Sequence, residues 1–222
     1  MPSTPKKSLV EFIGTAMLVC VVVGSGIMGT NQSNDDAVAL IVNTISTIFA
    51  LALLILVLGP VSGAHFNPVV TFARLFSKDL TLATAFAYTI AQTGGAIAGA
   101  MLANAMFDLD VLQISSHLRV SSGTLIGEVL ATAGLVALIQ ILISRKQDAV
   151  IAVSVAAWIG SAYFFTSSTS FANPAVTVGR IFSDTFAGIA PASVLPFIGA
   201  QIVGGLIGYL AAKTLDKQRN LA

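Results

Sequence analysis

Two Asn-Pro dipeptides are the residues best suited to contact a small solute. Asn67-Pro68 and Asn173-Pro174 lie 106 residues apart, and each opens an apolar run of about ten residues. Asparagine is a strong helix N-cap and proline is favoured in the first turn, so each dipeptide predicts the start of a short helix. The asparagine amide also carries two N–H donors. In apolar surroundings these donors can bind the oxygen of an uncharged solute.

Two carboxylates, Glu11 and Glu128, lie within long apolar runs. An ionisable group at membrane depth is costly and by default indicates a function. Gln92 and Gln201 are a second pair of polar residues in apolar segments. The residue types leave two roles open for the carboxylates, which are bracing of a neighbouring loop and binding of a solute or proton.

The composition is that of a membrane protein. Of the 222 residues, 55% are hydrophobic and 9% are charged, and the mean hydropathy is +0.89; soluble domains carry about 25% charged residues. The net charge of +1 and the scattered basic residues argue against a nucleic-acid partner. The single cysteine, Cys20, is interpreted as a packing residue.

No catalytic or cofactor motif accompanies this composition. The sequence has no metal-ligand cluster and no nucleotide-binding loop, so we expect no metal and no cofactor. Gly24-Ser25-Gly26 is a weak match to a nucleophile motif, but neither histidine is suitably placed as its partner. The chain is therefore not expected to be an enzyme.

The apolar segments predict an all-α membrane protein. A bilayer core of about 30 Å needs roughly 20 apolar helical residues. Six segments are long enough: about 9–29, 38–58, 81–106, 123–143, 149–167 and 191–213. The runs 67–76 and 173–182 are too short to span. Short helices at membrane depth occur only where they are buried in protein or line a water-filled cavity, which predicts two re-entrant half-helices.

Basic residues predict the orientation. With six spans and a cytoplasmic N-terminus, nine of the eleven lysines and arginines are cytoplasmic: Lys6, Lys7, Arg74, Lys78, Arg145, Lys146, Lys213, Lys217 and Arg219. Arg119 and Arg180 are the two that are not. This distribution satisfies the positive-inside rule with both termini in the cytoplasm.

The chain repeats itself. SGAHFNPVVTFARLFSKDL from Ser62 matches STSFANPAVTVGRIFSDTF from Ser168, and the segments around Glu11 and Glu128 also match. AQTGGAIAG from Ala91 resembles AQIVGGLIG from Ala200, and both contain GxxxG pairs that allow close helix packing. Each repeat, 8–106 and 122–213, holds three spans, so the two insert in opposite orientations within one channel domain, 1–222. A functional site is expected at the midplane between them.

Six spans, an inverted repeat and paired NPA-like motifs resemble the aquaporin (major intrinsic protein) family. The resemblance implies a bundle with one pore per subunit, assembled as a homotetramer in the lipid bilayer. It assigns the pore motifs to Asn67, Pro68, Val69, Asn173, Pro174 and Ala175. It also favours Glu11, Glu128, Gln92 and Gln201 as loop-bracing residues, and it places His65 at the cytoplasmic pore mouth. Val69 departs from the usual alanine and is expected to alter packing where the half-helices touch.

At the selectivity filter, this chain departs further from the family pattern than it does at Val69. Water and glycerol channels usually have an arginine directly after the second NPA, but this chain has Val176 there. By spacing, the other filter residues are Thr47, Ser161 (with Gly160 as its alternative) and Ser170. Arg180, four residues after Val176, has a twin in Arg74 and is interpreted as structural or interfacial. Such a filter is wide and uncharged, unless Phe164, Phe165 or Phe171 narrows it.

GAHFNPVV with SFANPAVTVGR is similar to a bacterial branch of the family associated with arsenic resistance. The resemblance implies a passive inner-membrane channel for trivalent arsenic hydroxide, methylated arsenicals, glycerol-like polyols and water. A general glycerol, urea and water facilitator is the alternative. A coupled secondary transporter, which would use Glu11 and Glu128 as its ion site, is a third hypothesis.

Overall fold

The computed structural model describes residues 3–219, so the first two and last three residues of the expected 1–222 domain lie outside it. Six long helices and two short ones follow one another. The long helices are α1 (Thr4–Gln32), α2 (Asp36–Ser62), α4 (Leu82–Met106), α5 (Ser122–Ser144), α6 (Ile151–Phe165) and α8 (Pro191–Arg219). The short helices are α3 (Pro68–Phe76) and α7 (Pro174–Gly179), and one-turn 3₁₀ helices, η1 (Asp148–Val150) and η2 (Arg180–Phe182), lie beside α6 and α7.

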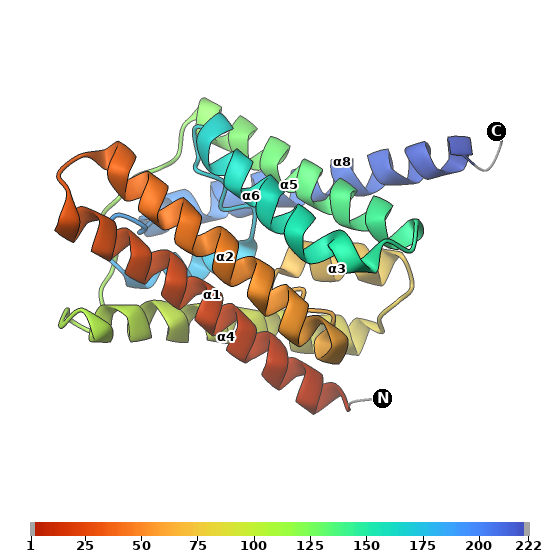
Figure 1. Cartoon of the computed structure of the whole chain (residues 1–222), viewed down its shortest axis with the longest axis horizontal. Coiled ribbons are helices and arrows are strands. Elements are labelled where there is room, and N and C mark those ends of the chain that lie inside the picture. Colours follow the sequence, from red (N-terminus) through yellow and green to blue (C-terminus); the bar gives the residue numbers. More distant parts are fainter. Residues whose placement is uncertain (1–2, 220–222) are drawn as a thin grey trace.

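The long helices form a bundle around α3 and α7 (Figure 1). The start of α1 and the end of α8 lie at the same end of this bundle. Five helices of the described chain are long and apolar enough to cross a membrane: α1, α2, α5, α6 with η1, and α8. The sixth, α4, is equally long but richer in small and polar residues. The all-α fold with six spans and two half-helices is confirmed.

Glycine pairs bring the first and last helices of each half together. A Cβ on Gly95 or Gly99 of α4 would collide with backbone carbonyls of α1. A Cβ on Gly204 or Gly208 of α8 would collide with backbone carbonyls of α5. Backbones packed this closely require glycine at the contact, as in other membrane helix pairs. The predicted close packing at both GxxxG pairs is therefore present.

Both half-helices begin as the Asn-Pro dipeptides predict. The Oδ1 of Asn67 accepts a hydrogen bond from the Val69 N–H (3.0 Å). The Oδ1 of Asn173 accepts from the N–H groups of Ala175 (3.0 Å) and Val176 (3.2 Å). In each case a proline directly follows the cap.

Val69 packs differently from the prediction. Its side chain lies in a buried cluster with Ala73, Val136 and Tyr209, and its Cγ1 occupies the space that a Cβ on Gly205 of α8 would need. The expectation that Val69 alters the contact between the two half-helices is therefore wrong. The extra methyl groups are accommodated by the absence of a side chain at Gly205.

This packing predicts that Gly205→Ala destabilises the protein by about 1–3 kcal/mol, because overpacking forces neighbouring atoms to move. Thermal unfolding in detergent measures the effect, and adding Val69→Ala should restore most of the loss. Gly199→Ala is the matched control in the same helix, since a Cβ there meets nothing within 4 Å. If Gly199→Ala and Gly205→Ala behave alike, the proposed size match between Val69 and Gly205 is refuted.

Candidate functional site

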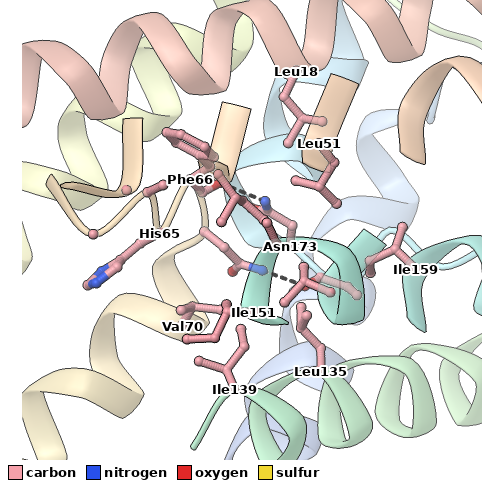
Figure 2. A pocket seen from close by; sticks show the side chains of 18 of the residues that line it. Leu18, Leu51, His65, Phe66, Val70, Leu135, Ile139, Ile151, Ile159 and Asn173 are labelled. Atoms are coloured by element: carbon pink, nitrogen blue, oxygen red, sulfur yellow. Dashed lines mark hydrogen bonds between the residues drawn. The ribbon is translucent and has the colours of Figure 1, made fainter. Parts of the chain in front are cut away.

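A cavity of about 690 Å³ passes between the two Asn-Pro motifs. Its α2 lining begins at Thr47 and continues through Leu51 and Ile55 to Gly59. At 1.5 Å per residue, these residues cover about 18 Å of helix axis. Apolar side chains form much of the wall, and Figure 2 shows Leu18, Leu51, Leu135, Ile139 and Ile159 around the amide of Asn173. An elongated space whose walls are mostly apolar suits the passage of small uncharged molecules.

The two asparagines link the halves across this cavity. The Asn67 amide nitrogen donates to the Ala172 carbonyl (2.8 Å), and the Asn173 amide nitrogen donates to the Phe66 carbonyl (2.8 Å). Both bonds are drawn in the close-up (Figure 2). Each amide has two N–H donors, so one donor per asparagine remains for a solute in the cavity.

The loop before each asparagine has an unusual backbone. Phe66 and Ala172, the residues that precede the asparagines, have φ of 50° and 47°. Ala64 and Ser170, two residues earlier in each loop, have φ of 49° and 52°. Left-handed backbone at residues with a side chain costs energy and persists only where surrounding contacts hold it. These loops therefore need an external restraint.

Glu11 supplies that restraint in the first half. Its Oε1 accepts hydrogen bonds from the Ser62 hydroxyl (2.6 Å) and the His65 N–H (3.0 Å). Its Oε2 accepts from the Phe66 N–H (2.7 Å) and the Gln92 amide (2.8 Å). With four donors on one carboxylate, Glu11 has no need of a solute partner.

Glu128 has the corresponding contacts in the second half. It accepts from the N–H groups of Phe171 (2.9 Å) and Ala172 (2.8 Å) and from the Gln201 amide (2.7 Å). The Gln201 amide also donates to the Thr177 hydroxyl (2.9 Å), which donates to the Asn173 carbonyl (2.8 Å). Neither glutamate is among the described residues that line the cavity. This geometry favours the bracing role, which remains a prediction.

Two threonines that the sequence analysis did not single out complete these networks. Thr71, the counterpart of Thr177, accepts from the Gln92 amide (3.0 Å) and donates to the Asn67 carbonyl (3.0 Å). A chain of contacts thus leads from glutamate through glutamine and threonine to the asparagine in each half. Both threonines lie four residues after the asparagine in the repeated block, and this spacing was a signal that could have identified them.

His65 lies in the cavity wall, 3.1 Å from the Thr71 hydroxyl through its Nδ1. Because the Thr71 hydroxyl hydrogen already points to the Asn67 carbonyl, we assign the ring proton to Nδ1. Nε2 is then left as an acceptor. The His65 ring also meets Tyr88 edge-on, with centroids 5.4 Å apart. His65 thus lines the cavity, and its place at the cytoplasmic pore mouth remains a prediction.

Three of the four expected filter residues line the cavity: Thr47, Ser170 and Val176. Ser161 does not, so its assignment was wrong: its side chain is exposed, and its hydroxyl donates to the Ala157 carbonyl of its own helix (2.9 Å). The α6 residues that line the cavity are Ile151, Ala152, Val155, Ile159 and Tyr163. With 3.6 residues per turn, Ser161 lies on the other side of the helix. Gly160, the alternative, packs against Ile48.

Tyr163 therefore takes the place expected for Ser161. Its hydroxyl donates to the Thr47 hydroxyl (3.4 Å), which brings two polar groups together at this end of the cavity. Of the three aromatic residues that were candidates for narrowing the pore, Phe171 lines the cavity, whereas Phe164 and Phe165 are exposed. Two aromatic side chains, Tyr163 and Phe171, therefore line the filter region beside Thr47, Ser170 and Val176.

The two repeated arginines have different surroundings. Arg74 forms a salt bridge with Asp79 (2.6 Å) and donates to the side-chain Oε1 of Gln140 (3.1 Å). Arg180 is buried, lines the cavity and stacks on the Phe171 ring. The sequence predicted the same structural or interfacial role for both arginines. The packing shows that they differ, since Arg74 is paired with Asp79 and Arg180 stacks on Phe171 in the cavity wall.

Two loops close the end of the bundle that holds Arg180. The loop 107–121 bonds to the segment 181–190 through Ser115, Ser116 and His117. The N–H of Ser116 donates to the Asp184 carboxylate and lowers the pKa of that carboxyl below its ordinary value. Arg119, in the same loop, is partly buried, and this burial lowers the pKa of its guanidinium.

The cavity geometry predicts the effect of Asn173→Asp. The aspartate retains the cap acceptors but loses the donor to the Phe66 carbonyl and adds a negative charge beside the cavity. We expect cation leak to rise, because a carboxylate attracts cations to a site where the half-helix N-terminus otherwise repels them. Potassium flux in proteoliposomes measures this effect, with Asn67→Asp as the symmetric companion. Unchanged leak in both variants would show that these side chains do not face the permeating species.

Comparisons with known proteins agree with this architecture. The family model for the major intrinsic proteins matches residues 2–171. Aquaglyceroporin AqpS of Rhizobium meliloti (strain 1021) is 45% identical over 90% of this chain and 86% of its own length. Aquaporin-4 of Mus musculus is 26% identical over 95% of this chain and 69% of its own length.

A solved structure shares the fold. The X-ray structure of the aquaglyceroporin from Plasmodium falciparum superposes with a TM-score of 0.71 at 21% identity, covering 99% of this chain and all of that one. Together, the family match and the arrangement of two half-helices beside the cavity identify the chain. It belongs to the major intrinsic protein family and is a multi-pass membrane channel of the aquaporin type.

Proposed function

We propose that this protein is a passive channel for small uncharged hydroxylated solutes. The proposed solutes are glycerol-like polyols and water, together with trivalent arsenic hydroxide and methylated arsenicals. The observation that carries the proposal is the cavity itself. It is lined largely by apolar side chains, with uncharged polar groups at the two asparagines and at Thr47, Tyr163 and Ser170. Ionisable side chains also line it, at His65, Arg74, Asp79, Asp148 and Arg180.

The polar groups suit a solute with several hydroxyl groups. Asn67 and Asn173 each retain one amide donor, and the Ser170 hydroxyl is buried with no partner among the described residues. A polyol or a neutral metalloid hydroxide can exchange its hydration for these contacts, whereas an ion cannot recover its hydration energy from them. This exclusion of ions is a general property of aquaporin-type pores and is applied here to these residues.

The name of one relative also supports this solute class. A protein called an aquaglyceroporin is 45% identical to this chain over most of its length. Val176 follows the second NPA motif in place of arginine, and this smaller side chain leaves room for solutes larger than water. The arsenic part of the proposal rests on the resemblance of the two motif segments and on the similar shape of a polyol and a trihydroxide.

Coupled transport is less well supported. A transporter of this architecture would place an ion site near the midplane, and Glu11 and Glu128 are the ionisable residues available in its apolar spans. Both carboxylates are occupied by backbone and glutamine donors. Flux that is independent of proton and sodium gradients is the expected result.

We further propose an inverted repeat of residues 8–106 and 122–213, with pseudo-equivalent networks at Glu11 and Glu128. The protein is placed as a homotetramer in a bacterial inner membrane. Both termini are placed in the cytoplasm, and the distribution of basic residues supports this orientation. Accessibility labelling of cysteines added near each terminus tests the orientation. Native mass spectrometry tests the tetramer.

The deciding experiment compares solute entry into proteoliposomes and empty vesicles. Stopped-flow light scattering follows water and glycerol, and elemental analysis follows trivalent arsenite. Entry of all three down their gradients supports the full proposal. Entry of glycerol and water without arsenite favours the general facilitator. Entry of water alone overturns the proposed solute class.

A further inference from the structure

Two lysines lie where α3 and α8 meet, outside the cavity wall. Lys78 directly follows Ser77, the C-cap of α3, and Lys213 lies in the last part of α8. Both residues are exposed, and neither lines the cavity. They belong to the end of the bundle that holds the start of α1 and the end of α8 (Figure 1). The two lysines and the side chains between them are called the α3–α8 patch below.

Two aromatic rings connect the segments that carry these lysines. The Lys213 Nζ lies 4.7 Å from the centroid of the Tyr209 ring. The centroid of the Tyr209 ring is in turn 5.9 Å from that of Phe76, the last residue of α3, which comes two residues before Lys78. A cation over an aromatic face is stabilised by the ring quadrupole. Tyr209 therefore holds the Lys213 ammonium group beside the end of α3.

Helix α5 fixes the end of α3 in this position. The Ser77 hydroxyl and the Arg74 Nη1 both donate to the side-chain Oε1 of Gln140, each over 3.1 Å. Tyr209 of α8 and Val136 of α5 also share one buried cluster with two residues of α3. Contacts from two long helices thus determine where the chain leaves α3, and the backbone of Lys78 starts from a fixed point.

The positive charge of the patch has no ionic partner in the part of the chain that the structure describes. The one salt bridge among the described side chains joins Arg74 to Asp79 (2.6 Å). That contact leaves Lys78 and Lys213 without a carboxylate. Two like charges near one another repel, and an anion placed between them interacts favourably with both. The patch is therefore suited to a negatively charged group.

An exposed apolar surface leads along α8 to Lys213. Leu206 and Leu210 come seven and three residues before Lys213, a spacing that places all three on one face of the helix. The two leucines are 52% and 53% exposed, and Phe76 beside them is 57% exposed. In a membrane protein, exposed apolar side chains of a spanning helix contact the acyl chains of lipids. An apolar face that ends in unpaired ammonium groups matches the polarity of an anionic phospholipid.

We propose that the α3–α8 patch binds an anionic phospholipid, with the headgroup phosphate between Lys78 and Lys213. An acyl chain lies along Leu206 and Leu210, with Phe76 at its side. Basic pockets between membrane helices are known binding sites for anionic headgroups. A lipid held in this way bridges the half-helix α3 to α8 and stabilises the contact between them. The inference goes beyond the proposed channel function and does not depend on which solute passes.

The experiment adds phosphatidylglycerol or phosphatidylcholine with identical acyl chains to the full-length protein in detergent. Native mass spectrometry counts the retained lipids, and thermal unfolding measures stabilisation. Phosphatidylglycerol should stay bound and raise the melting temperature by several degrees, because a ligand that binds only the folded state stabilises it. Phosphatidylcholine, whose headgroup has no net charge, should have a much smaller effect. Inorganic phosphate should have none, since it lacks the acyl chains that contact α8.

Paired variants locate the site. Lys78→Gln combined with Lys213→Gln should weaken phosphatidylglycerol binding by about tenfold or more, because each basic residue near an anionic headgroup adds to the attraction. Lys78→Arg combined with Lys213→Arg keeps both charges and should retain most of the binding. Lys6→Gln combined with Lys7→Gln is the matched control. It removes the same charge at the same end of the bundle, from the start of α1, and should leave binding unchanged.

Equal binding of phosphatidylglycerol to the wild type and to the Lys78→Gln, Lys213→Gln protein overturns the site. An equal loss in the Lys6→Gln, Lys7→Gln control also overturns it, since attraction would then follow total charge. Stabilisation by inorganic phosphate that equals that by phosphatidylglycerol refutes a lipid as the occupant. If the glutamine variants do not elute as the wild type does, the wild-type comparison decides: equal stabilisation by the two lipids refutes the proposal. None of these measurements uses solute flux, so the proposed function can fail independently.

Discussion

Glu128→Ala is expected to abolish stable folding of the second re-entrant loop and to remove most solute flux. The substitution leaves the N–H groups of Phe171 and Ala172 and the Gln201 amide without their acceptor. Each unpaired buried donor costs about 1–3 kcal/mol. The combined loss is a large fraction of the 5–15 kcal/mol that typically stabilises a folded domain.

The backbone of the loop amplifies this loss. Ser170 and Ala172 have φ of 52° and 47°, a conformation that persists because the carboxylate holds the adjacent N–H groups. Without the carboxylate, the loop can relax and Asn173 can leave the cavity. Thermal unfolding in detergent and glycerol flux in proteoliposomes measure the two consequences.

Companion variants separate bracing from simple charge removal. Glu11→Ala should have a similar effect on the first loop, because Glu11 accepts from the His65 and Phe66 N–H groups. Asp110→Ala removes an exposed carboxylate and should change neither stability nor flux. A Glu128→Ala protein with wild-type melting temperature would contradict the bracing role. A proton-coupled flux that disappears in such a stable variant would instead favour coupled transport.

Val176→Arg has the second large expected effect, a loss of glycerol flux that exceeds the loss of water flux. Val176 is buried in the cavity wall, one turn before Arg180 on the same face of the chain. A second guanidinium there fills space and adds a positive charge near the first. We expect glycerol permeability to fall by about tenfold or more, because pore diameter and lining donors determine which neutral solutes pass.

Stopped-flow measurements of water and glycerol entry on the same vesicles give the ratio of glycerol permeability to water permeability. Val176→Met separates size from charge, since it lengthens the side chain without adding a donor or a charge. A partial loss of glycerol flux in Val176→Met and a larger loss in Val176→Arg would show both contributions. Equal loss of water and glycerol in Val176→Arg would argue against Val176 as a filter residue.

The helices and the NPA-like motifs could be predicted from local chemistry. Six runs of apolar residues are long enough to span a bilayer, and the Asn-Pro dipeptides mark the starts of α3 and α7. The duplicated blocks also pointed to the right pairs, since Glu11 with Gln92 and Glu128 with Gln201 form hydrogen bonds in the structure. These features depend on residue type and spacing, which the sequence contains directly.

The composition of the filter could not be predicted in full because it depends on helix rotation. Ser161 was chosen by spacing, but the cavity-facing side of α6 includes Ile159 and Tyr163. A shift of two residues turns a helix by about 200°, which exchanges a lining residue for an outward-facing one. In an apolar transmembrane helix both faces are hydrophobic, so the pattern of residues carries little information about this rotation.

By itself, the sequence determined the membrane environment, the number of spans, the caps of the two half-helices and the paired polar residues. Only the tertiary structure decided which side chains share the cavity. Arg74 and Arg180 are identical in type and in place within the repeat, yet one pairs with Asp79 and the other stacks on Phe171. The difference arises from residues distant in sequence, because the energy of a buried charge depends on the groups that packing brings within a few ångströms of it.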